Sequence, residues 1–312
     1  MDSVPDTDKR TKAGAMVSLA QLLTRARQGG YAVCYCESWN LESLQAVIEA
    51  AEAMRSPVVA GFNGGFLMHP SRAKPENLAH YAGLAGVIRE ASVPVAFLLN
   101  ETESLPQIER GIELGFNSVM VENEHLSLGD YRRLIKQVVA LAHPLKVSVE
   151  AQIGRLPTGS SREQPKGEIT NPAEARALVE ETGIDALAVS IGNVHILTQG
   201  KAPVDLEVLE RIQSAVKIPL VLHGGTSFPS ACAREVISRG IVKFNFGTCL
   251  KQAYLTAVKK ALARYQEPMN PHVYLGMGGP EDILQAGREA VKQKAMELIH
   301  DYGFGGEPRK VL

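Results

Sequence analysis

The segment Leu220-Val-Leu-His-Gly-Gly-Thr-Ser227 is an apolar run that ends in a histidine, two glycines and two hydroxyl side chains. Directly after it, residues 229–239 carry apolar side chains at helical spacing. A buried strand ends in an imidazole at low cost only where that ring has a partner, and a glycine-rich turn before a helix N-terminus suits an anion. The segment therefore predicts a strand, a turn and a helix, with a metal and a phosphate bound near the turn.

The same alternation of an apolar run and an amphipathic segment recurs along the whole chain. Eight runs rich in Val, Ile, Leu and Ala are expected to be strands, at 32–36, 57–61, 93–99, 118–121, 146–151, 186–190, 220–223 and 242–246. Eight helices are expected between and after them, at 41–54, 75–89, 104–114, 128–142, 172–182, 205–216, 229–239 and 248–265. Near-continuous apolar strands suit a parallel sheet covered by helices, so the pattern predicts an α/β fold, a TIM (β/α)8 barrel. A doubly wound open sheet is the alternative, although no G-x-G-x-x-G motif follows the first run.

Two further segments flank the eight units. Residues 1–14 are charged and lack periodicity, so we expect a disordered tail, whereas 18–27 predict a helix that plugs the bottom of the barrel. Residues 280–302 predict an extra C-terminal helix that packs on the barrel wall or on a neighbouring subunit. We expect residues 15–312 to form a single TIM-barrel domain with a C-terminal helical extension.

Composition narrows the class of partner. The chain has 312 residues, and its 33 Lys and Arg against 34 Asp and Glu give a formal net charge of −1. No basic field is available for nucleic acid or an anionic membrane, so a small molecule is the expected partner. No apolar stretch approaches about 20 residues and the N-terminus is polar, which favours a cytoplasmic protein. The four cysteines are too few for a disulfide framework, and we expect reduced thiols.

Polar side chains gather at the predicted strand ends, where the chemistry of this fold is located. They are Glu37, Asn63, Asn100, Glu101, Glu122, Glu150, His195, His223 and Asn245. Carboxylates and imidazoles that meet at one mouth repel or stay protonated unless a cation compensates them. A divalent metal is therefore expected at this mouth.

Zinc suits the nitrogen and oxygen donors in this set. His195 and His223 supply neutral imidazole nitrogens, and Glu101 or Glu150, or both, complete a site that keeps one position open for substrate. We expect His195, His223 and Glu101 as the principal ligands. Glu150 is then an alternative ligand or a hydrogen-bond partner of a ligand.

Several segments together resemble the class II (metal-dependent) ketose-bisphosphate aldolases, the fructose- and tagatose-bisphosphate group. The resemblance covers residues 16–302, in order. It is carried by Tyr31-Ala-Val, Asn40-Leu-Glu-Ser-Leu-Gln-Ala-Val-Ile-Glu-Ala-Ala-Glu52, Gly115-Phe-Asn-Ser-Val-Met-Val121, Val147-Ser-Val-Glu-Ala-Gln-Ile-Gly-Arg-Leu156, Ile191-Gly-Asn-Val-His195, Leu222-His-Gly-Gly-Thr-Ser227 and Lys243-Phe-Asn245.

The resemblance implies a TIM barrel, often dimeric or tetrameric, that performs reversible aldol cleavage. Zinc in such an enzyme polarises the ketose carbonyl and stabilises an enediolate. By this resemblance His195, His223 and Glu150 fall on metal-ligand positions, and Asn245 falls on a position that contacts the ketose. Substrate contacts are also expected from the phosphate-binding turn and its neighbours, namely Gly224, Gly225, Thr226, Ser227 and Thr248.

The chain departs from the family pattern within the site. The third strand of the family ends in His-x-Asp-His, whose Asp is the acid/base and whose final His binds zinc, whereas this chain has Leu98-Leu-Asn-Glu101. Asn100 cannot take a proton, so we expect Glu122 or Glu37 to act as the acid/base. Further departures replace a family Gly by Ile196, Lys by Gln199, Asn by Glu37, Ser by Asn63 and Asp by Glu122, and the eighth strand continues as Asn245-Phe-Gly-Thr-Cys249.

These departures predict an aldolase-like carbon–carbon lyase with an altered substrate rather than a standard fructose-bisphosphate aldolase. The expected substrate is a ketose, a sugar phosphate or a related keto compound with fewer phosphates. Ile196 predicts a weaker phosphate grip on the loop that faces the glycine turn. A noncatalytic, metal-containing protein that binds a sugar or sugar phosphate is the alternative.

Overall fold

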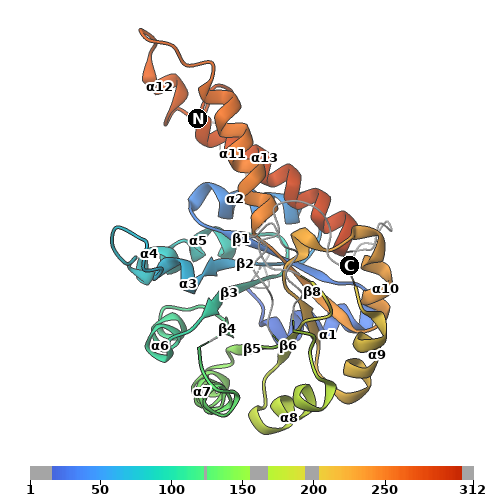
Figure 1. Ribbon diagram of the computed structural model, residues 1–312. Coiled ribbons are helices and arrows are strands. Elements are labelled where there is room, and N and C mark those ends of the chain that lie inside the picture. Colours follow the sequence, from blue (N-terminus) through green and yellow to red (C-terminus); the bar gives the residue numbers. More distant parts are fainter. Residues whose placement is uncertain (1–15, 123–124, 155–167, 194–203, 304–312) are drawn as a thin grey trace, which may run out of the picture.

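The chain folds as a closed barrel of eight parallel strands in sequence order, β1 to β8 (Figure 1). The computed structural model describes residues 16–122, 125–154, 168–193 and 204–303. The strands are β1 (Val33–Ser38), β2 (Val58–Asn63), β3 (Val95–Thr102), β4 (Ser118–Val121), β5 (Ser148–Ile153), β6 (Ala186–Val189), β7 (Leu220–Leu222) and β8 (Ile241–Phe246). Each of them overlaps one of the eight predicted runs, and the TIM-barrel prediction is confirmed. The expected tail over 1–14 lies outside the described residues.

Helices surround the barrel and alternate with its strands. They are α2 (Leu41–Ala53), α3 (Gly64–Leu67), α4 (Leu78–Gly83), α5 (Ala85–Arg89), α6 (Leu105–Glu113), α7 (Leu128–Ala142), α8 (Pro172–Thr182), α9 (Leu206–Ala215), α10 (Ala233–Ser238) and α11 (Thr248–Leu262). Side-chain caps begin several of them: the Asn171 amide oxygen accepts from Ala173 N, and Pro172 occupies the first helical position of α8.

The helix predicted over 229–239 begins later than expected. A 3-10 turn (Gly225–Ser227) follows β7, a second 3-10 turn (Ser230–Cys232) comes next, and α10 starts only at Ala233. The glycine turn therefore does not lead directly into an α-helix. The prediction that a helix N-terminus contributes to anion binding directly after this turn is therefore wrong.

The core has an inner and an outer layer. Inside the barrel, Tyr35, Val59 and Leu98 pack with Leu19 and Leu23 of α1 (Leu19–Gly29), which closes the bottom. Ser18 caps the start of α1 through Gln21 N, and Gly30 ends it in the left-handed conformation (φ 63°). The larger outer layer lies between the strands and the surrounding helices. Because packing among the described residues fills the lower half of the barrel, ligands are expected at its upper mouth.

The C-terminal helices form an arm that projects from the barrel (Figure 1). The arm consists of α11, α12 (Pro271–Tyr274) and α13 (Ile283–Leu298), and a π-helical turn (Ile299–Gly303) follows it. Tyr254 of α11 packs so tightly on Gly287 of α13 that a Cβ atom there would lie 2.3 Å from its ring. Large apolar side chains stay exposed along the arm, namely Leu255, Leu262, Met269, Leu275 and Met277.

Candidate active site

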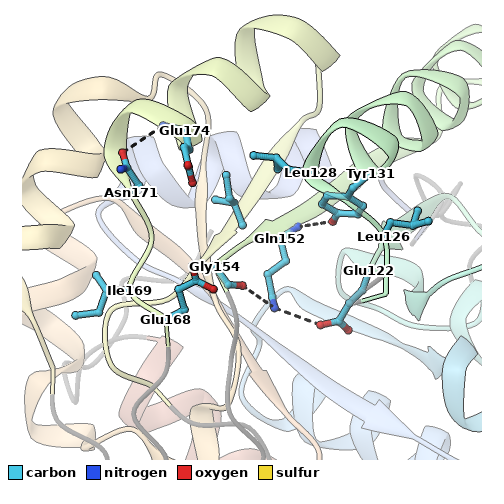
Figure 2. A pocket seen from close by; sticks show the side chains of 11 residues that line it. Glu122, Leu126, Leu128, Tyr131, Gln152, Gly154, Glu168, Ile169, Asn171 and Glu174 are labelled. Atoms are coloured by element: carbon cyan, nitrogen blue, oxygen red, sulfur yellow. Dashed lines mark hydrogen bonds between the residues drawn. The ribbon is translucent and has the colours of Figure 1, made fainter.

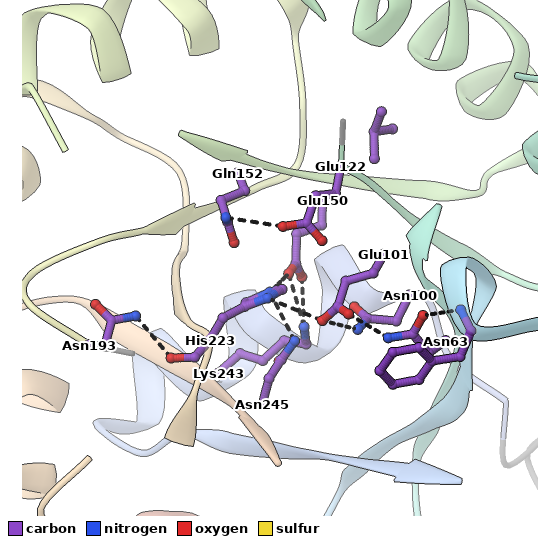
Figure 3. A network of polar contacts seen from close by, with 12 residues as sticks. Asn63, Asn100, Glu101, Glu122, Glu150, Gln152, Asn193, His223, Lys243 and Asn245 are labelled. Carbon is purple, nitrogen blue, oxygen red and sulfur yellow. Dashed lines mark hydrogen bonds and ion pairs between the residues drawn. The ribbon is translucent and has the colours of Figure 1, made fainter. Parts of the chain in front are cut away.

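Polar side chains from β2, β3, β4, β5, β7 and β8 meet at the mouth of the barrel (Figure 3). Side chains two residues apart on a strand share a face, so Glu150 and Gln152 of β5 both point inward, as do Lys243 and Asn245 of β8. The structure thus brings together most of the strand-end residues expected from the sequence. His195 is the exception, because it lies outside the described residues.

A buried ion pair between Lys243 and Glu150 lies beneath the mouth. Lys243 Nζ is 2.8 Å from Glu150 Oε2 and 3.1 Å from Oε1, and neither side chain has any exposed surface. Burial lowers the pKa of Lys243. Burial alone raises the pKa of Glu150, but the Lys243 ammonium and the bond to His223 outweigh it, so the net shift is downward and the carboxylate stays ionised. No role is predicted for Lys243 from the sequence, although a lysine inside the apolar strand Ile241-Val-Lys-Phe-Asn245 is an available signal.

His223 connects this ion pair to the mouth. Its Nε2 is 2.9 Å from Glu150 Oε1 and 2.9 Å from the Asn245 side-chain nitrogen, and its Nδ1 is 3.7 Å from Glu101 Oε1. Burial lowers the pKa of His223, so the ring is neutral at pH 7. Because ionised Glu150 only accepts hydrogen bonds, Nε2 carries the proton and donates a hydrogen bond to Glu150. The Asn245 amide must then turn its oxygen, rather than its nitrogen, toward Nε2. This tautomer, inferred from the partners, places the ring's lone pair at Nδ1, on the side of Glu101.

The Glu101 carboxylate is held by two side-chain amides. Asn100 Nδ2 donates to Glu101 Oε1 at 2.9 Å, and Asn63 Nδ2 donates to Oε2. The Asn63 oxygen accepts from Phe66 N at 2.9 Å, which fixes the orientation of that amide. Glu101 has a φ of 48°, in the left-handed region, where the pairing of β3 with β4 shifts register between Leu99 and Thr102. A strained backbone at such an irregularity redirects a side chain.

A divalent cation fits between His223 and Glu101. A neutral imidazole nitrogen and a carboxylate oxygen 3.7 Å apart both offer lone pairs, and zinc binds these donors at about 2.0–2.2 Å. Within the described ranges no group of three or more His, Cys, Asp or Glu side chains is arranged to hold a metal. Glu150 contacts Lys243 and His223 with its carboxylate, which places it as a hydrogen-bond partner of His223. The described residues thus supply two candidate ligands, and the expected third, His195, is beyond them.

Glu122 lies at the edge of the mouth, beside a cavity of about 580 Å³ (Figure 2). Gln152 Nε2 donates to Glu122 Oε1 at 3.2 Å and lies 3.5 Å from Gly154 O. Two more carboxylates, Glu168 and Glu174, line the same cavity. The structure therefore joins Glu122 to the inward-facing side of β5 through Gln152.

Glu37 lies in a second cavity, of about 260 Å³, above the glycine turn. Glu37 forms an ion pair with Lys251 of α11, whose Nζ also lies 4.4 Å from the centre of the Phe66 ring. Gly224, Thr226, Asn245 and Thr248, all expected to contact substrate, line this cavity. Lys251 was not among the expected site residues; its place in the first turn of the helix after β8 was the only signal in the sequence.

The glycine turn itself is tightly built. Gly224 has a φ of 66°, and a Cβ atom on Gly225 would lie 2.8 Å from Asn245 O. Ser227 Oγ donates to Gly224 O at 2.8 Å, and Cys249 N donates to Thr226 Oγ1 at 3.3 Å. Glycine is therefore required at both positions, by backbone conformation at Gly224 and by close packing at Gly225.

Comparisons with known proteins agree with this architecture. The model of the family described as fructose-bisphosphate aldolase class-II matches residues 17–307. The chain belongs to this family. A crystal structure of the YdjI aldolase from Escherichia coli K12 is 31% identical, covers 94% of this chain and 100% of its own, and superposes with a TM-score of 0.75. A putative fructose-1,6-biphosphate aldolase from Coccidioides immitis is 28% identical over 95% of this chain and 98% of its own, with a TM-score of 0.72. The chain is therefore an aldolase-like lyase.

The fold is shared more widely still. A fructose-bisphosphate aldolase from Campylobacter jejuni is 22% identical, covers 95% of this chain and 97% of its own, and has a TM-score of 0.74. At this identity the likeness concerns the fold alone.

Proposed function

We propose that this chain is a metal-dependent aldolase that cleaves a ketose, a sugar phosphate or a related keto compound other than fructose 1,6-bisphosphate. The observation that carries the proposal is the pairing of His223 Nδ1 with Glu101 Oε1 at 3.7 Å, at the mouth of an aldolase barrel. His223, Glu101 and His195 would hold a divalent ion, for which zinc is our first choice. When bound, the ion polarises the substrate carbonyl and stabilises the negative charge that develops on its oxygen.

The chain's own residues prepare these ligands. Glu150 accepts a hydrogen bond from Nε2 of His223 and so orients the ring, and Lys243 holds Glu150 as an ionised acceptor. Asn63 and Asn100 each donate to one oxygen of Glu101 and so hold the carboxylate in place. Each ligand thus has a hydrogen-bonded support that fixes its position before substrate arrives.

Proton transfer in this proposal falls to Glu122. Asn100 has no titratable proton, and the Glu37 carboxylate is engaged by the Lys251 ammonium. Glu122 accepts a hydrogen bond from the neutral amide of Gln152, at the edge of the larger cavity. We propose Glu122 as the acid/base and Glu37 as a residue that shapes the pocket over the glycine turn. Gly224, Gly225, Thr226, Ser227 and Thr248 would then contact the ketose end of the substrate, together with Asn245.

Metal analysis tests this proposal. Purified protein should hold one divalent ion per chain by elemental analysis, and His223→Ala and His195→Ala should lose it. His300→Ala, an exposed position in the π-helical turn, is the matched control and should retain it. Stoichiometric metal in both site variants would refute the ligand assignment.

Exchange of substrate protons tests the chemistry separately. Metal-loaded protein should exchange protons of dihydroxyacetone phosphate, dihydroxyacetone or a related ketose with deuterium, because the activated carbonyl acidifies its neighbouring C–H bonds. Glu122→Gln should slow this exchange more than Glu37→Gln. An unchanged rate in Glu122→Gln would show that another group carries the proton.

We also propose that the protein is a homo-dimer or homo-tetramer assembled through its arm. Leu255, Leu262, Leu275 and Met277 expose between 51% and 66% of their surface on this projecting element, and exposed apolar patches mark association sites. Leu275→Asp together with Met277→Asp should reduce the sedimentation coefficient to that of a monomer. The control Leu145→Asp, 64% exposed on another face, should leave the sedimentation coefficient unchanged.

No helix among the described residues is long and apolar enough to span a membrane. The predicted cytoplasmic location stays a prediction.

A further inference from the structure

Two buried side-chain amides at the mouth, Asn100 and Gln152, share one arrangement. Each donates its N–H to a neighbouring carboxylate, Asn100 to Glu101 Oε1 at 2.9 Å and Gln152 to Glu122 Oε1 at 3.2 Å. A carboxylate oxygen accepts and does not donate, so the amide nitrogen must face it. These contacts fix the orientation of both amides and turn their oxygens the other way.

The two amide oxygens are buried acceptors. Asn100 has no exposed surface and Gln152 only 7%, and neither Asn100 Oδ1 nor Gln152 Oε1 accepts a hydrogen bond within the described part of the chain. A buried acceptor without a donor is unfavourable, and in native proteins such an acceptor is paired with ordered water, an ion or a ligand group. Figure 3 shows Gln152 beside Glu122 and Asn100 beside Glu101, in the same polar network as His223. Both oxygens therefore belong to the mouth at which His223 and Glu101 would hold the proposed metal.

We propose that these two oxygens accept hydrogen bonds from hydroxyl groups of the substrate, which is a polyhydroxylated carbonyl compound without phosphate on the segment they contact. This inference rests on the proposed function and deepens it by naming the substrate class. A hydroxyl group supplies the donor that each amide oxygen lacks. A phosphate supplies only acceptors at neutral pH and is repelled by the carboxylates beside both amides.

The larger cavity supports the same class of substrate. Glu122 connects it to Gln152, and its other charged lining residues are Glu168 and Glu174. No Lys, Arg or His is among the described residues that line it. A phosphorylated segment placed there finds no cation within this lining, whereas hydroxyl groups find several acceptors.

Binding of unreactive polyols tests the inference without any turnover. We would titrate metal-loaded protein with erythritol and threitol, with 1,2,4-butanetriol, which lacks one hydroxyl, and with glycerol 3-phosphate, by saturation-transfer NMR. At least one tetritol should bind about five- to tenfold more tightly than butanetriol, the effect of one hydrogen bond to a buried acceptor. Equal affinities for tetritol and butanetriol would overturn the proposal. So would glycerol 3-phosphate that binds more tightly than the tetritol and displaces it, because its phosphate would then occupy this segment.

A variant assigns the effect to its residue. Gln152→Met keeps the length of the side chain and removes the acceptor, so it should weaken tetritol binding about five- to tenfold and abolish discrimination against butanetriol. The control Gln293→Met makes the same change on the exposed face of α13 and should leave both affinities unchanged. Unchanged tetritol binding in Gln152→Met would refute the role of Gln152. The comparison of tetritol with butanetriol in the wild type stands even if the variant fails to fold.

Failure of this inference and failure of the proposed function are distinguishable. Proton exchange into dihydroxyacetone phosphate with no tetritol preference would support the lyase and overturn the substrate class. Tetritol preference without exchange into any ketose would support the substrate class and overturn the proposed chemistry.

Discussion

Replacing Lys243 by Met should destabilise the protein strongly, because it leaves the Glu150 carboxylate buried without its ammonium partner. Both side chains have no exposed surface and are joined by contacts of 2.8 and 3.1 Å. Removal of one partner from a buried ion pair costs about 3–5 kcal/mol of unfolding free energy. Met has a similar length, so the loss arises from the missing charge and not from a large cavity.

Urea unfolding at fixed protein concentration measures this loss by linear extrapolation. The double variant Lys243→Met with Glu150→Gln removes both charges, so it should recover at least about 2 kcal/mol relative to Lys243→Met. Lys294→Met, which breaks an exposed pair with Glu297, is the control and should cost less than about 0.5 kcal/mol.

Two results would refute the reasoning. A cost below about 1 kcal/mol for Lys243→Met would show that the pair contributes no more than a surface contact. A double variant as unstable as Lys243→Met would show that the loss comes from packing and not from an uncompensated carboxylate.

Three further outcomes are expected. Burial lowers the pKa of His223 in the folded chain, so the unfolded chain binds more protons, and the stability of the metal-free protein should fall as the pH drops below about 6.5. His223→Gln should flatten this part of the profile of unfolding free energy against pH, measured with urea, and an unchanged slope would contradict the assignment. Gly225→Ala should cost about 1–3 kcal/mol in urea unfolding, because its Cβ would lie 2.8 Å from Asn245 O, whereas Gly83→Ala meets no atom within 4 Å and should be neutral or stabilising. Asn100→Asp should weaken metal binding in a competition titration and bring no cleavage of fructose 1,6-bisphosphate, because it replaces a hydrogen-bond donor to Glu101 by a second carboxylate. A gain in cleavage would show that only an acid/base was missing.

The barrel was predictable because its strands are buried on both faces. A parallel strand under helices is apolar almost throughout, so each strand appears in the sequence as a short apolar run, and all eight runs overlap a strand. Helix boundaries were less secure. The helix predicted over 75–89 is divided at Leu84 into α4 and α5, next to two residues of low helix propensity, Gly83 and Gly86.

Strand-end residues were also predictable, but their pairing was not. The rule that parallel strands present their carboxyl ends at one mouth placed Glu101, Glu150 and His223 together from the sequence alone. The contact between Glu150 and Lys243 joins residues 93 positions apart, and the side-chain direction of Glu101 depends on a left-handed φ of 48°. Neither feature has a local sequence signal, because one depends on barrel closure and the other on a shift of register.

The departures from the family pattern at Asn63, Asn100 and Glu101 form one physical unit. A carboxylate at position 101 needs donors around it, and the amides of Asn63 and Asn100 supply one to each of its oxygens. An Asp at position 100 would instead set two carboxylates side by side, and one of them would have to take up a proton. In our proposal Glu101 takes the place of the family's histidine ligand, and this change is accompanied by the loss of the acid/base at position 100. Proton transfer must then move to another carboxylate, which is why we assign it to Glu122 and why the amide oxygen left at Asn100 is available to a substrate hydroxyl.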